Sequence, residues 1–525
     1  MKLSDHDLLQ LDEEYLTSLK SDALLAVSRK MLSDLKESRE RLNQTPDNSS
    51  QPPSSRSPFL GIPEEPSEEE DQDPQVKKET PEDDGDPPGD DGDSEASTDE
   101  AETPRSKTRK PKPKAGKQVG APGFGRQQKI PTQREEIHKA EWCATCDAMI
   151  PADSPFTARI AYYVLDLAFG SPEQPGLKLL CSKHIFGDAT CGCGHITRSD
   201  PGTGERHVVE GRKEATCLSE WRLVGPMLAA FIVALALRMR LSRSRIKEFL
   251  SDWLGLELST GTVDRCIREA GLAADPVHDE LIAEARQSGL IHVDETPWKE
   301  KGVVRWLWVF VTANTVLFLV GRRTRQVVTD ILTESFGGWL MSDGLMNYRI
   351  FQNRLRCLAH LIRKARGLVE SLDEKTRQFG NRALEVLEFV TGQARDGPEA
   401  SIFEPIMSDF KKYCEWYRSK PPSGKVRSLA VEFLNDWDVI WLVLKHPWLP
   451  LTNNEAERAL RHWVIARLIS HGTRTAEGSR VFSVLASVIE TCRKRKVSPW
   501  IYLAKVIAER RKGNPAPPLP IPAIN

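Results

Sequence analysis

Residues 289–343 decide the fold, and they read GLIHVDETPWKEKGVVRWLWVFVTANTVLFLVGRRTRQVVTDILTESFGGWLMSD. A short apolar run, 290–294, comes first, and its last residue is Asp294. Two β-rich runs follow, 303–312 and 316–321, and a tight polar connection joins them. Runs of this composition around a short polar connection are typical of a β-hairpin. The stretch therefore predicts a strand that ends in an acid, followed by two antiparallel strands.

A helix and a fourth strand follow the hairpin. Residues 325–336 have helical character, and the apolar run 339–342 leads directly into Asp343. The order strand–strand–strand–helix–strand is that of the ribonuclease H-like fold, in which the first and fourth strands are neighbours. We therefore predict an α/β fold class in which Asp294 and Asp343 meet at one end of the sheet. The simpler interpretation is that Asp294 ends a strand and that Asp343, before a glycine, forms a turn.

The third acidic candidate lies much further along the chain. A charge-rich helical stretch runs over 356–445, and LTNNEAERALRHW at 451–463 then opens another helix with Glu457 in its first turn. Glu457 also has a purely structural interpretation. Asn454 with Glu457 fits a capping box, and Glu457 with Arg461 fits an i,i+4 ion pair.

The composition excludes several classes of protein. The chain has 525 residues, 39% hydrophobic and 28% charged, so its length predicts two to four domains. The longest apolar run, 223–237, contains Pro226 and is shorter than the roughly 20 residues that cross a bilayer. The first residues, MKLSDHDLLQLDEE, are acidic where a signal peptide is basic and then apolar. Ten cysteines are too few for a disulfide scaffold. We expect a cytoplasmic protein without a membrane span.

A strong charge asymmetry lies behind the net charge of −2. Residues 64–102 contain 19 acids and two lysines, whereas residues 105–134 contain ten basic residues and no acid. Such blocks repel themselves and stay solvated, so residues 43–137 are predicted to be a disordered linker. Its basic half is either a plain linker or an arm that contacts phosphates.

Residues 1–42 are predicted to form an N-terminal helix, because residues 3–42 contain neither glycine nor proline. Leu25 and Leu32 fit position d of a heptad repeat, and Leu35 and Leu42 fit position a. The segment is therefore either a short coiled coil for self-association or a lone amphipathic helix.

A small cysteine-bearing module is predicted over residues 138–217. Zn²⁺ prefers four thiolate or imidazole ligands in a tetrahedron, and a CxxC turn supplies two of them. We predict a zinc-ribbon-like site with one CxxC and one CxC pair: Cys143, Cys146, Cys191 and Cys193. Cys181 with His184, or His195, are alternative ligands, and scattered buried thiols are the other interpretation.

Residues 218–285 are predicted to be helical, with a helix-turn-helix character. Ser242 is placed to cap a helix that runs through Trp253 and ends at Gly255.

A second helix in the same region is predicted to start with a cap at Ser259 or Thr260 and to end at Gly271. Its outward residues would suit the phosphates and base edges of a DNA major groove: Thr262, Arg265 and Arg268. A three-helix packing module without DNA contacts is the alternative.

Four motifs occur in a fixed order along the chain: IHVDETPWK, SDGLMNY, RCLAHLIRKAR and NNEAERALR. Together with GTRTAEGSRVFSVLASVIETCRKRKVSPWIYL, they resemble the IS66 family of bacterial insertion-sequence transposases, over roughly residues 140–515. The resemblance implies a ribonuclease H-like DDE catalytic domain at 286–470, with a helical insertion at about 356–445. A C-terminal helical region and a Pro-rich tail follow, at 471–525.

The resemblance also implies the site residues. Asp294, Asp343 and Glu457 would be the catalytic triad and would bind Mg²⁺ or Mn²⁺, while Zn²⁺ at the cysteines would be structural. The family's third acid directly precedes arginine in an NNxxER string, which selects Glu457 and leaves Glu455 as a neighbour. Hard oxygen ligands suit Mg²⁺, and a pair of such ions stabilises the attacking and leaving oxygens of a phosphodiester. From the residues themselves we expect Cys357 and His360 to brace the sheet against the insertion, with metal binding as the alternative, and Asn454 to cap the helix of Glu457. Arg458 and Arg461 are expected to face DNA phosphates, and the alternative is that each is simply a solvated charge.

The function implied is that of a bacterial transposase. It would bind the terminal inverted repeats of its element, cleave DNA strands and transfer them to target DNA. Its partners would be DNA, further copies of the chain in a synaptic complex, and small accessory proteins of the element. Two other functions are weighed against this one: a catalytically silent DNA-binding repressor derived from a transposase, and a stand-alone ribonuclease H-like nuclease.

Overall fold

The computed structural model describes residues 10–42, 130–170, 175–199 and 224–521, together with residues 7, 48, 173, 208–209 and 212–213. These residues belong to one of two compact units of the chain, and the other unit, Ser57–Lys129, lies outside the described residues. The described part is a mixed α/β structure with two larger sheets. None of its helices is both long and apolar enough to cross a membrane.

The central sheet has five strands in the order β11-β10-β7-β8-β9. Its strands are β7 (Leu290–Glu300), β8 (Val303–Val311), β9 (Val316–Gly321), β10 (Trp339–Ser342) and β11 (Arg354–Arg356). β7, β8 and β9 form an antiparallel meander, whereas β10 is parallel to both β7 and β11. The predicted strands and hairpin are confirmed, although β7 continues six residues beyond Asp294. The predicted helix between β9 and β10 is α7 (Arg325–Leu332), which ends earlier than expected.

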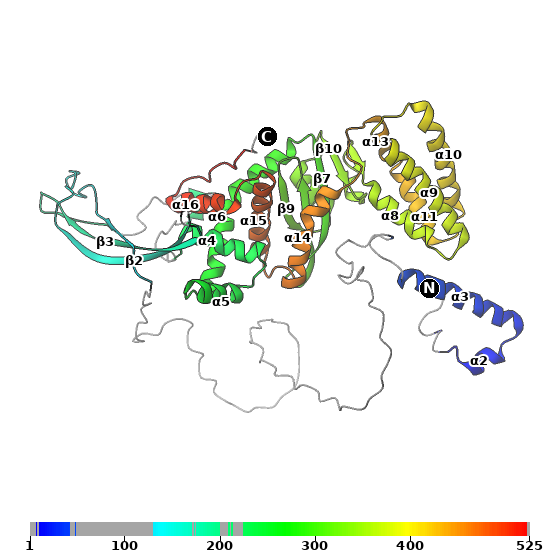
Figure 1. Cartoon of the computed structure of the whole chain (residues 1–525), viewed down its shortest axis with the longest axis horizontal. Helices are drawn as coiled ribbons and strands as arrows, with labels where there is room; N and C mark the ends of the chain where they lie inside the picture. The colour runs from blue at the N-terminus through cyan, green and yellow to red at the C-terminus, as the bar shows by residue number, and fades with distance from the viewer. Residues whose placement is uncertain are drawn as a thin grey trace, which may run out of the picture. The chain divides into compact units, whose positions relative to one another are not determined.

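Alternate residues of the sheet enter two different cores, as the two-residue period of a strand requires. On β8, Trp308 and Phe310 belong to the larger core, whereas Leu307 and Val309 face the smaller one. The helices that cover the sheet are α6 (Thr260–Arg286), α14 (Asn454–Ser470) and α15 (Ala476–Lys494), and Figure 1 shows α14 and α15 beside the strands. Both faces of the meander are therefore buried.

Helix α15 also completes the outer edge of the sheet with its hydroxyl groups. The backbone N–H groups of β9 donate to side chains spaced four residues apart on the helix, where they share one face. The pairs are Val320 with Ser483 Oγ (3.2 Å), Phe318 with Ser487 Oγ (2.8 Å) and Val316 with Thr491 Oγ1 (3.0 Å). An exposed sheet edge is a template for pairing with other chains, and these side chains occupy it.

The helical region before the sheet consists of α4 (Pro226–Val233), a π-helical turn (Ala234–Arg238), α5 (Arg243–Leu254) and α6. The prediction for α5 is confirmed: Ser242 accepts a hydrogen bond from the N–H of Arg245, and Gly255 ends the helix with a φ of +63°. The predicted end of the second helix is wrong, because α6 continues through Gly271 to Arg286. A Cβ on Gly271 would lie 2.7 Å from Val481 of α15, so this glycine permits close helix packing.

A helical insertion follows β11 and forms a separate core. It consists of α8 (Leu358–Val369), α9 (Glu374–Gln393), α10 (Ala400–Ser419), α11 (Gly424–Asn435), α12 (Trp437–Ile440) and α13 (Leu442–Lys445). Its core contains Phe379, Phe410 and Phe433, and it extends to Met341 of β10 and Leu355 of β11. The predicted helical stretch between the second and third acids therefore has a hydrophobic centre of its own.

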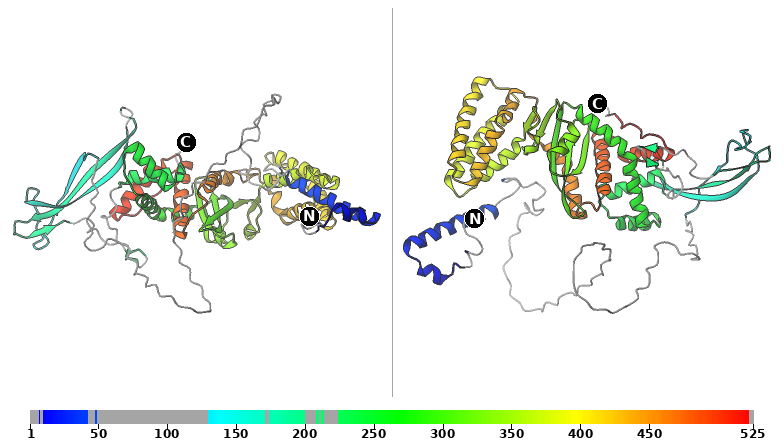
Figure 2. Two further views of the ribbon diagram at one scale, coloured as in Figure 1. Left: turned by 90° about the horizontal axis from the view of Figure 1, so that it is seen from below. Right: turned by 180° about the vertical axis from the view of Figure 1, so that it is seen from behind.

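A second sheet precedes the helical region, and we call residues 134–198 the β-arm. It contains β1 (Arg134–His138), β2 (Phe156–Phe169), β3 (Leu177–Thr190) and β4 (Ile196–Arg198). β2 and β3 form a long antiparallel pair, which is drawn in cyan in Figures 1 and 2. Leu165, Leu167 and Cys181 at one end of this pair join the same core as α4 and α6.

The remaining elements are α2 (Glu13–Ser18), α3 (Ser21–Leu42), the strand pair β5 (Val208–Val209) and β6 (Arg212–Lys213), a 3-10 helical turn (Met346–Tyr348) and α16 (Pro499–Lys512). The N-terminal helix is thus divided at Leu19, which is extended with a ψ of 140°. Helix α16 buries Leu503, Val506 and Ile507 in the same core as α4 and α6. The predicted linker lies largely outside the described residues, and Arg134–His138 at its end forms β1.

Candidate active site and cysteine cluster

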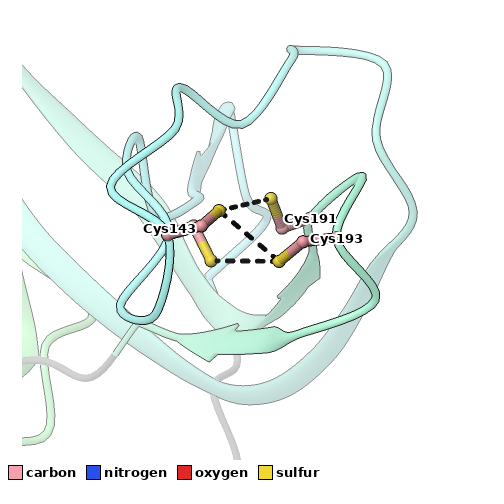
Figure 3. A group of neighbouring side chains, drawn as sticks. Cys143, Cys191 and Cys193 are labelled. Carbon is pink, nitrogen blue, oxygen red and sulfur yellow. Dashed lines mark hydrogen bonds between the residues drawn. The ribbon is translucent and has the colours of Figure 1, made fainter.

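The four cysteines predicted as ligands lie together in the β-arm. The Sγ–Sγ distances are 3.7 Å for Cys143–Cys193, 3.7 Å for Cys146–Cys191 and 3.5 Å for Cys146–Cys193 (Figure 3). Four thiolates bound at about 2.3 Å around a tetrahedral Zn²⁺ are roughly 3.8 Å apart, whereas a disulfide is about 2.05 Å long. The cluster is therefore suited to hold a metal ion.

Two tight turns present these cysteines. In the first turn the N–H of Cys143 donates to the carbonyl of Ala148 (2.9 Å), and in the second the N–H of Cys191 donates to the carbonyl of His195 (2.9 Å). Gly194 has a φ of +86°, which favours glycine at this position. Backbone N–H groups of Cys146 and Thr145 lower the pKa of the Cys143 thiol to about 6. The turn therefore favours the thiolate of Cys143, which is the form that binds metals. The pKa of Cys146 is instead raised to about 12, because the Ala148 N–H that lowers it is outweighed by hydrogen bonds with Cys193, Cys143 and Cys191.

The alternative ligands from the sequence lie elsewhere. Cys181 is buried in the large core with α4 and α6, and His184 lies beside Glu136 and His138 on the neighbouring strand. His195 is exposed in the second turn and does not belong to the four-sulfur group.

The first two acids lie on adjacent parallel strands. Asp294 is part of β7, and Asp343 directly follows β10. Met341 of β10 pairs with His292 of β7 in a parallel register. Asp343 and Asp294 each follow two residues later, so they lie at the same level of the sheet. Burial raises the pKa of Asp294 well above its usual value, and Asp343, Glu295 and Glu457 raise it further. Asp294 therefore lies in the electrostatic field of both other predicted acids, with Asp343 contributing more than Glu457. Among the described residues, however, the three acids do not form a group whose ligand atoms all lie within 4.8 Å of one another.

Glu295, next to Asp294, was not identified from the sequence. Its side chain is 1% exposed, it pairs with Arg323 (Nη2–Oε1, 2.8 Å), and it accepts a hydrogen bond from Tyr348 Oη (2.7 Å). Burial, followed by the charge of Asp343, raises the pKa of Glu295. Tyr348 belongs to the SDGLMNY motif, and this was the signal that could have indicated a polar partner in the preceding strand.

The third acid, Glu457, lies in the first turn of α14 and faces the helical insertion. Arg363 of α8 donates to its Oε1 (3.1 Å), so the predicted partner Arg461 is replaced by a residue from another helix. His360 Nε2 lies 3.8 Å from the same carboxylate. Burial, aided by Arg363, lowers the pKa of His360 to about 3, so this imidazole is neutral. Glu457, His360 and Cys357 form a second group, whose ligand atoms all lie within 4.8 Å of one another.

Asn453 connects the third acid to the first. It is the N-cap residue of α14, one position before the Asn454 of the predicted capping box, and its side chain does not cap the helix. Instead, its Nδ2 donates to the carbonyl of Val293 in β7 (2.8 Å). Its backbone N–H donates to Cys357 Sγ (3.2 Å). Asn453 is fully buried, so the start of α14 is tied to the strand that carries Asp294.

A buried ion-pair network lies behind the second acid. Arg356 of β11 is 1% exposed and contacts Glu432 and Asp436 of the insertion, and Lys364 also binds Glu432 (2.8 Å). Gly344, which follows Asp343, has a φ of +96°, and a Cβ at this position would meet the Arg356 guanidinium. The turn after Asp343 therefore rests directly on this network.

The predicted DNA-binding residues lie on two helices. On α6, Arg265 and Arg268 are exposed, whereas Thr262 is half-buried. Arg268 pairs with Glu477 of α15. On α14, Arg458 and Arg461 are exposed, and Arg458 also pairs with Glu455 (3.3 Å).

The structure thus defines an α/β protein with Asp294 and Asp343 level on neighbouring strands of its central sheet and a cysteine cluster in the β-arm. A family model described as "Transposase IS66 family" matches residues 222–481, which include all three acids. The chain belongs to the IS66 transposase family.

Two curated relatives come from Sinorhizobium fredii (strain NBRC 101917 / NGR234). "Uncharacterized protein y4jD" is 23% identical over 316 residues, which cover 53% of this chain and 61% of the relative. "Uncharacterized protein y4hP" is 24% identical over 296 residues, which cover 48% of this chain and 54% of the relative. The matched regions span little more than half the length of these relatives.

Proposed function

We propose that this transposase binds the ends of its own DNA element and uses Asp294, Asp343 and Glu457 to cleave and join DNA strands. The single observation that carries the proposal is the register of β7 and β10, which sets Asp343 level with Asp294 on the neighbouring strand. Burial and the charge of Asp343 raise the pKa of Asp294, and a perturbed carboxylate beside a second one is typical of catalytic centres. Burial and the charge of Asp343 both disfavour the ionised form of Asp294, so a bound cation would relieve an existing cost.

The sheet order supports a ribonuclease H-like assignment. Three antiparallel strands followed by two parallel ones, with β7 beside β10, correspond to the order predicted from the sequence. This order sets the first two acids at the same level, and Asn453 ties the helix of the third acid to β7. Each acid comes from a different element, so the cluster depends on the folded core rather than on one local motif.

The donor set fits Mg²⁺ or Mn²⁺ at the acids, because these ions prefer carboxylate oxygens. When bound, such ions would supply charge stabilisation for the attacking and leaving oxygens of a phosphodiester. The residues of this chain would do the rest. Asp294 and Asp343 would hold the ions from the sheet, and Glu457 would close the site from α14. Arg363 would keep the Glu457 carboxylate oriented through the hydrogen bond that it already donates.

The cysteine cluster fits Zn²⁺, which takes thiolate ligands in a closed structural site. We assign it a structural role, because the cluster joins the turn before β2 to the turn after β3. DNA contacts are proposed for the exposed arginines of α6 and α14, whose charges suit phosphates: Arg265, Arg268, Arg458 and Arg461.

The test is a strand-transfer assay with full-length protein, Mg²⁺, a labelled oligonucleotide from the end of the element, and a supercoiled plasmid. We expect joined product with the wild type and a loss of about 10³-fold with Asp343→Asn, because metal-assisted charge stabilisation is worth several kcal/mol. Asp330→Asn is the matched control, since Asp330 is an exposed residue of α7.

Three results would contradict the proposal in different ways. Binding of the oligonucleotide without cleavage by the wild type would indicate a repressor. Cleavage without joining would indicate a stand-alone nuclease. Equal joining by wild type and Asp343→Asn would remove Asp343 from the catalytic site, and a mobility-shift assay would verify that the variant still binds DNA.

A further inference from the structure

A group of three metal-ligating side chains lies on one face of the β-arm, apart from the four cysteines. β1 pairs with β3 in parallel, with Glu136 opposite His184 and His138 opposite Phe186. Side chains two residues apart on a strand share a face, and paired residues of neighbouring strands point the same way. The register therefore brings Glu136, His138 and His184 together on the same side of the sheet.

The ligand atoms of these three residues converge. His138 Nε2 lies 2.9 Å from His184 Nδ1, and Glu136 Oε2 lies 3.3 Å from the same nitrogen. The two imidazole centroids are 5.2 Å apart and their planes differ by 22°, so the two nitrogens point at each other almost within one plane. All three ligand atoms lie within 4.8 Å of one another.

A single hydrogen shared among His138 Nε2, His184 Nδ1 and Glu136 Oε2 cannot give both contacts of His184 Nδ1 a good hydrogen bond. A neutral imidazole nitrogen carries either a hydrogen or a lone pair, and an ionised carboxylate only accepts hydrogen bonds. If His184 Nδ1 accepts from His138, it carries no hydrogen for the Glu136 oxygen 3.3 Å away. If it donates to Glu136, the same hydrogen must be shared with His138. A divalent cation between the three atoms would be bound by two lone pairs and a carboxylate at once.

The surroundings hold the group in place. Phe186 stacks on the His138 ring at a centroid distance of 4.4 Å and an angle of 9°. Arg134 Nε binds the other oxygen of Glu136 (2.9 Å), which leaves Oε2 directed at His184. Contacts of this kind orient metal ligands in proteins. Metal–ligand bonds of 2.0–2.2 Å place neighbouring ligand atoms about 3–3.5 Å apart. The ligand atoms therefore need to separate by only a few tenths of an ångström, and the two imidazole rings must also turn so that both lone pairs are directed at the ion.

We propose that Glu136, His138 and His184 bind a divalent transition-metal ion of the zinc class, at a site separate from the cysteine cluster. Two imidazoles and one carboxylate suit Zn²⁺, Ni²⁺ or Co²⁺ better than Mg²⁺. The ion fastens β1, a strand of five residues, to β3. This site is independent of the proposed DNA chemistry, because none of its residues belongs to the acid cluster.

The experiment measures metal content and cobalt binding in the tag-free, full-length protein. Wild type is expected to hold two equivalents of Zn²⁺ per chain after dialysis against micromolar Zn²⁺. Glu136→Gln, His184→Gln and His138→Phe are each expected to lose one equivalent. His138→Phe keeps an aromatic ring against Phe186. Glu135→Gln is the matched control, because Glu135 is the adjacent residue of β1, faces the opposite side and pairs with Lys183.

Co²⁺ separates the two sites, since thiolate ligands give intense charge-transfer absorption and a histidine–carboxylate site gives only weak visible bands. The proposal is overturned if His138→Phe keeps both equivalents, if Glu135→Gln and Glu136→Gln lose metal equally, or if the wild type holds a single equivalent with thiolate bands alone. A failure of the cysteine cluster would instead remove the charge-transfer bands and leave the weak bands unchanged. A failed strand-transfer assay would not affect either readout.

Discussion

The cysteine cluster of the β-arm and the predicted acids of the central sheet both contain groups that disfavour one another's negative charge, but at one cysteine backbone hydrogen bonds outweigh this effect. Backbone N–H groups lower the pKa of Cys143, so its turn already stabilises a negative ligand. In the acid cluster, burial and the neighbouring carboxylates raise the pKa of Asp294. The cysteines come from two turns whose backbone orders them, and Cys146 keeps a raised pKa of about 12 because of its cysteine neighbours. The three acids come from β7, the end of β10 and α14, so their positions depend on the packing of the whole core.

The largest expected effect is on the cysteine cluster. Cys143→Ser combined with Cys191→Ser should abolish metal binding at this site and unfold both turns, because structural Zn²⁺ contributes on the order of 10 kcal/mol to folding. Metal analysis and limited proteolysis of the β-arm would measure this. His195→Ala should retain the metal, because His195 lies outside the four-sulfur group. Retention of full metal content by the double variant would show that the cysteines are not the ligands.

The next effect concerns the choice of the third acid. Glu457→Gln should lower the rate of strand joining by about 10³-fold, because a metal ligand is lost. Glu455→Gln should change the rate by less than about threefold, since substitutions at surface ion pairs have small effects. Glu455 pairs with Lys494 and Arg458 at 3.3 Å in both cases. Single-turnover joining assays on both variants show which glutamate is the third acid. A larger loss of joining rate in Glu455→Gln than in Glu457→Gln would assign that role to Glu455.

The smallest expected effect is a gain in thermal stability, whereas most substitutions lower stability. Asp294→Asn should raise the melting temperature in Mg²⁺-free buffer by about 1–3 °C, because it removes a repelled carboxylate. The raised pKa means that the wild-type carboxyl contributes most favourably below its usual pKa, and that this contribution is lost as the pH rises through the raised value. The difference between variant and wild type should therefore grow from pH 5 to pH 8.

Differential scanning calorimetry at both pH values measures this difference. Adding Mg²⁺ should narrow it at pH 8, because the ion binds the wild-type site and neutralises the carboxylates. A variant that is less stable than the wild type at both pH values would mean that Asp294 is favourably paired, contrary to the electrostatics described above.

Much of the site's framework could be predicted from the sequence, whereas the contacts around it could not. The position of Asp294 in β7 and of Asp343 after β10 followed from apolar runs with an acid at the end. The partner of Glu457 did not follow, because i,i+4 spacing selects Arg461 and the fold supplies Arg363 from α8. The burial of Glu295 could not be predicted either, because it depends on contacts with Arg323 and Tyr348 from other segments of the chain. The catalytic roles themselves stay predictions.

The sequence by itself determined the elements whose signals are local. The strands of the central sheet, α5 with its Ser242 cap, and the CxxC and CxC turns taken one at a time were all predicted from residues close together in the sequence. The approach of the two cysteine turns spans 45 residues between Cys146 and Cys191 and depends on the fold of the β-arm. Tertiary structure alone decided the rest. Gly271 permits packing against Val481 instead of ending α6, and Asn453 binds β7 instead of capping α14. The physical reason is one of magnitude. An unfavourable helix propensity, such as that of glycine, lowers stability by about 1 kcal/mol per residue, and the free energy gained from long-range packing and buried hydrogen bonds readily exceeds this loss.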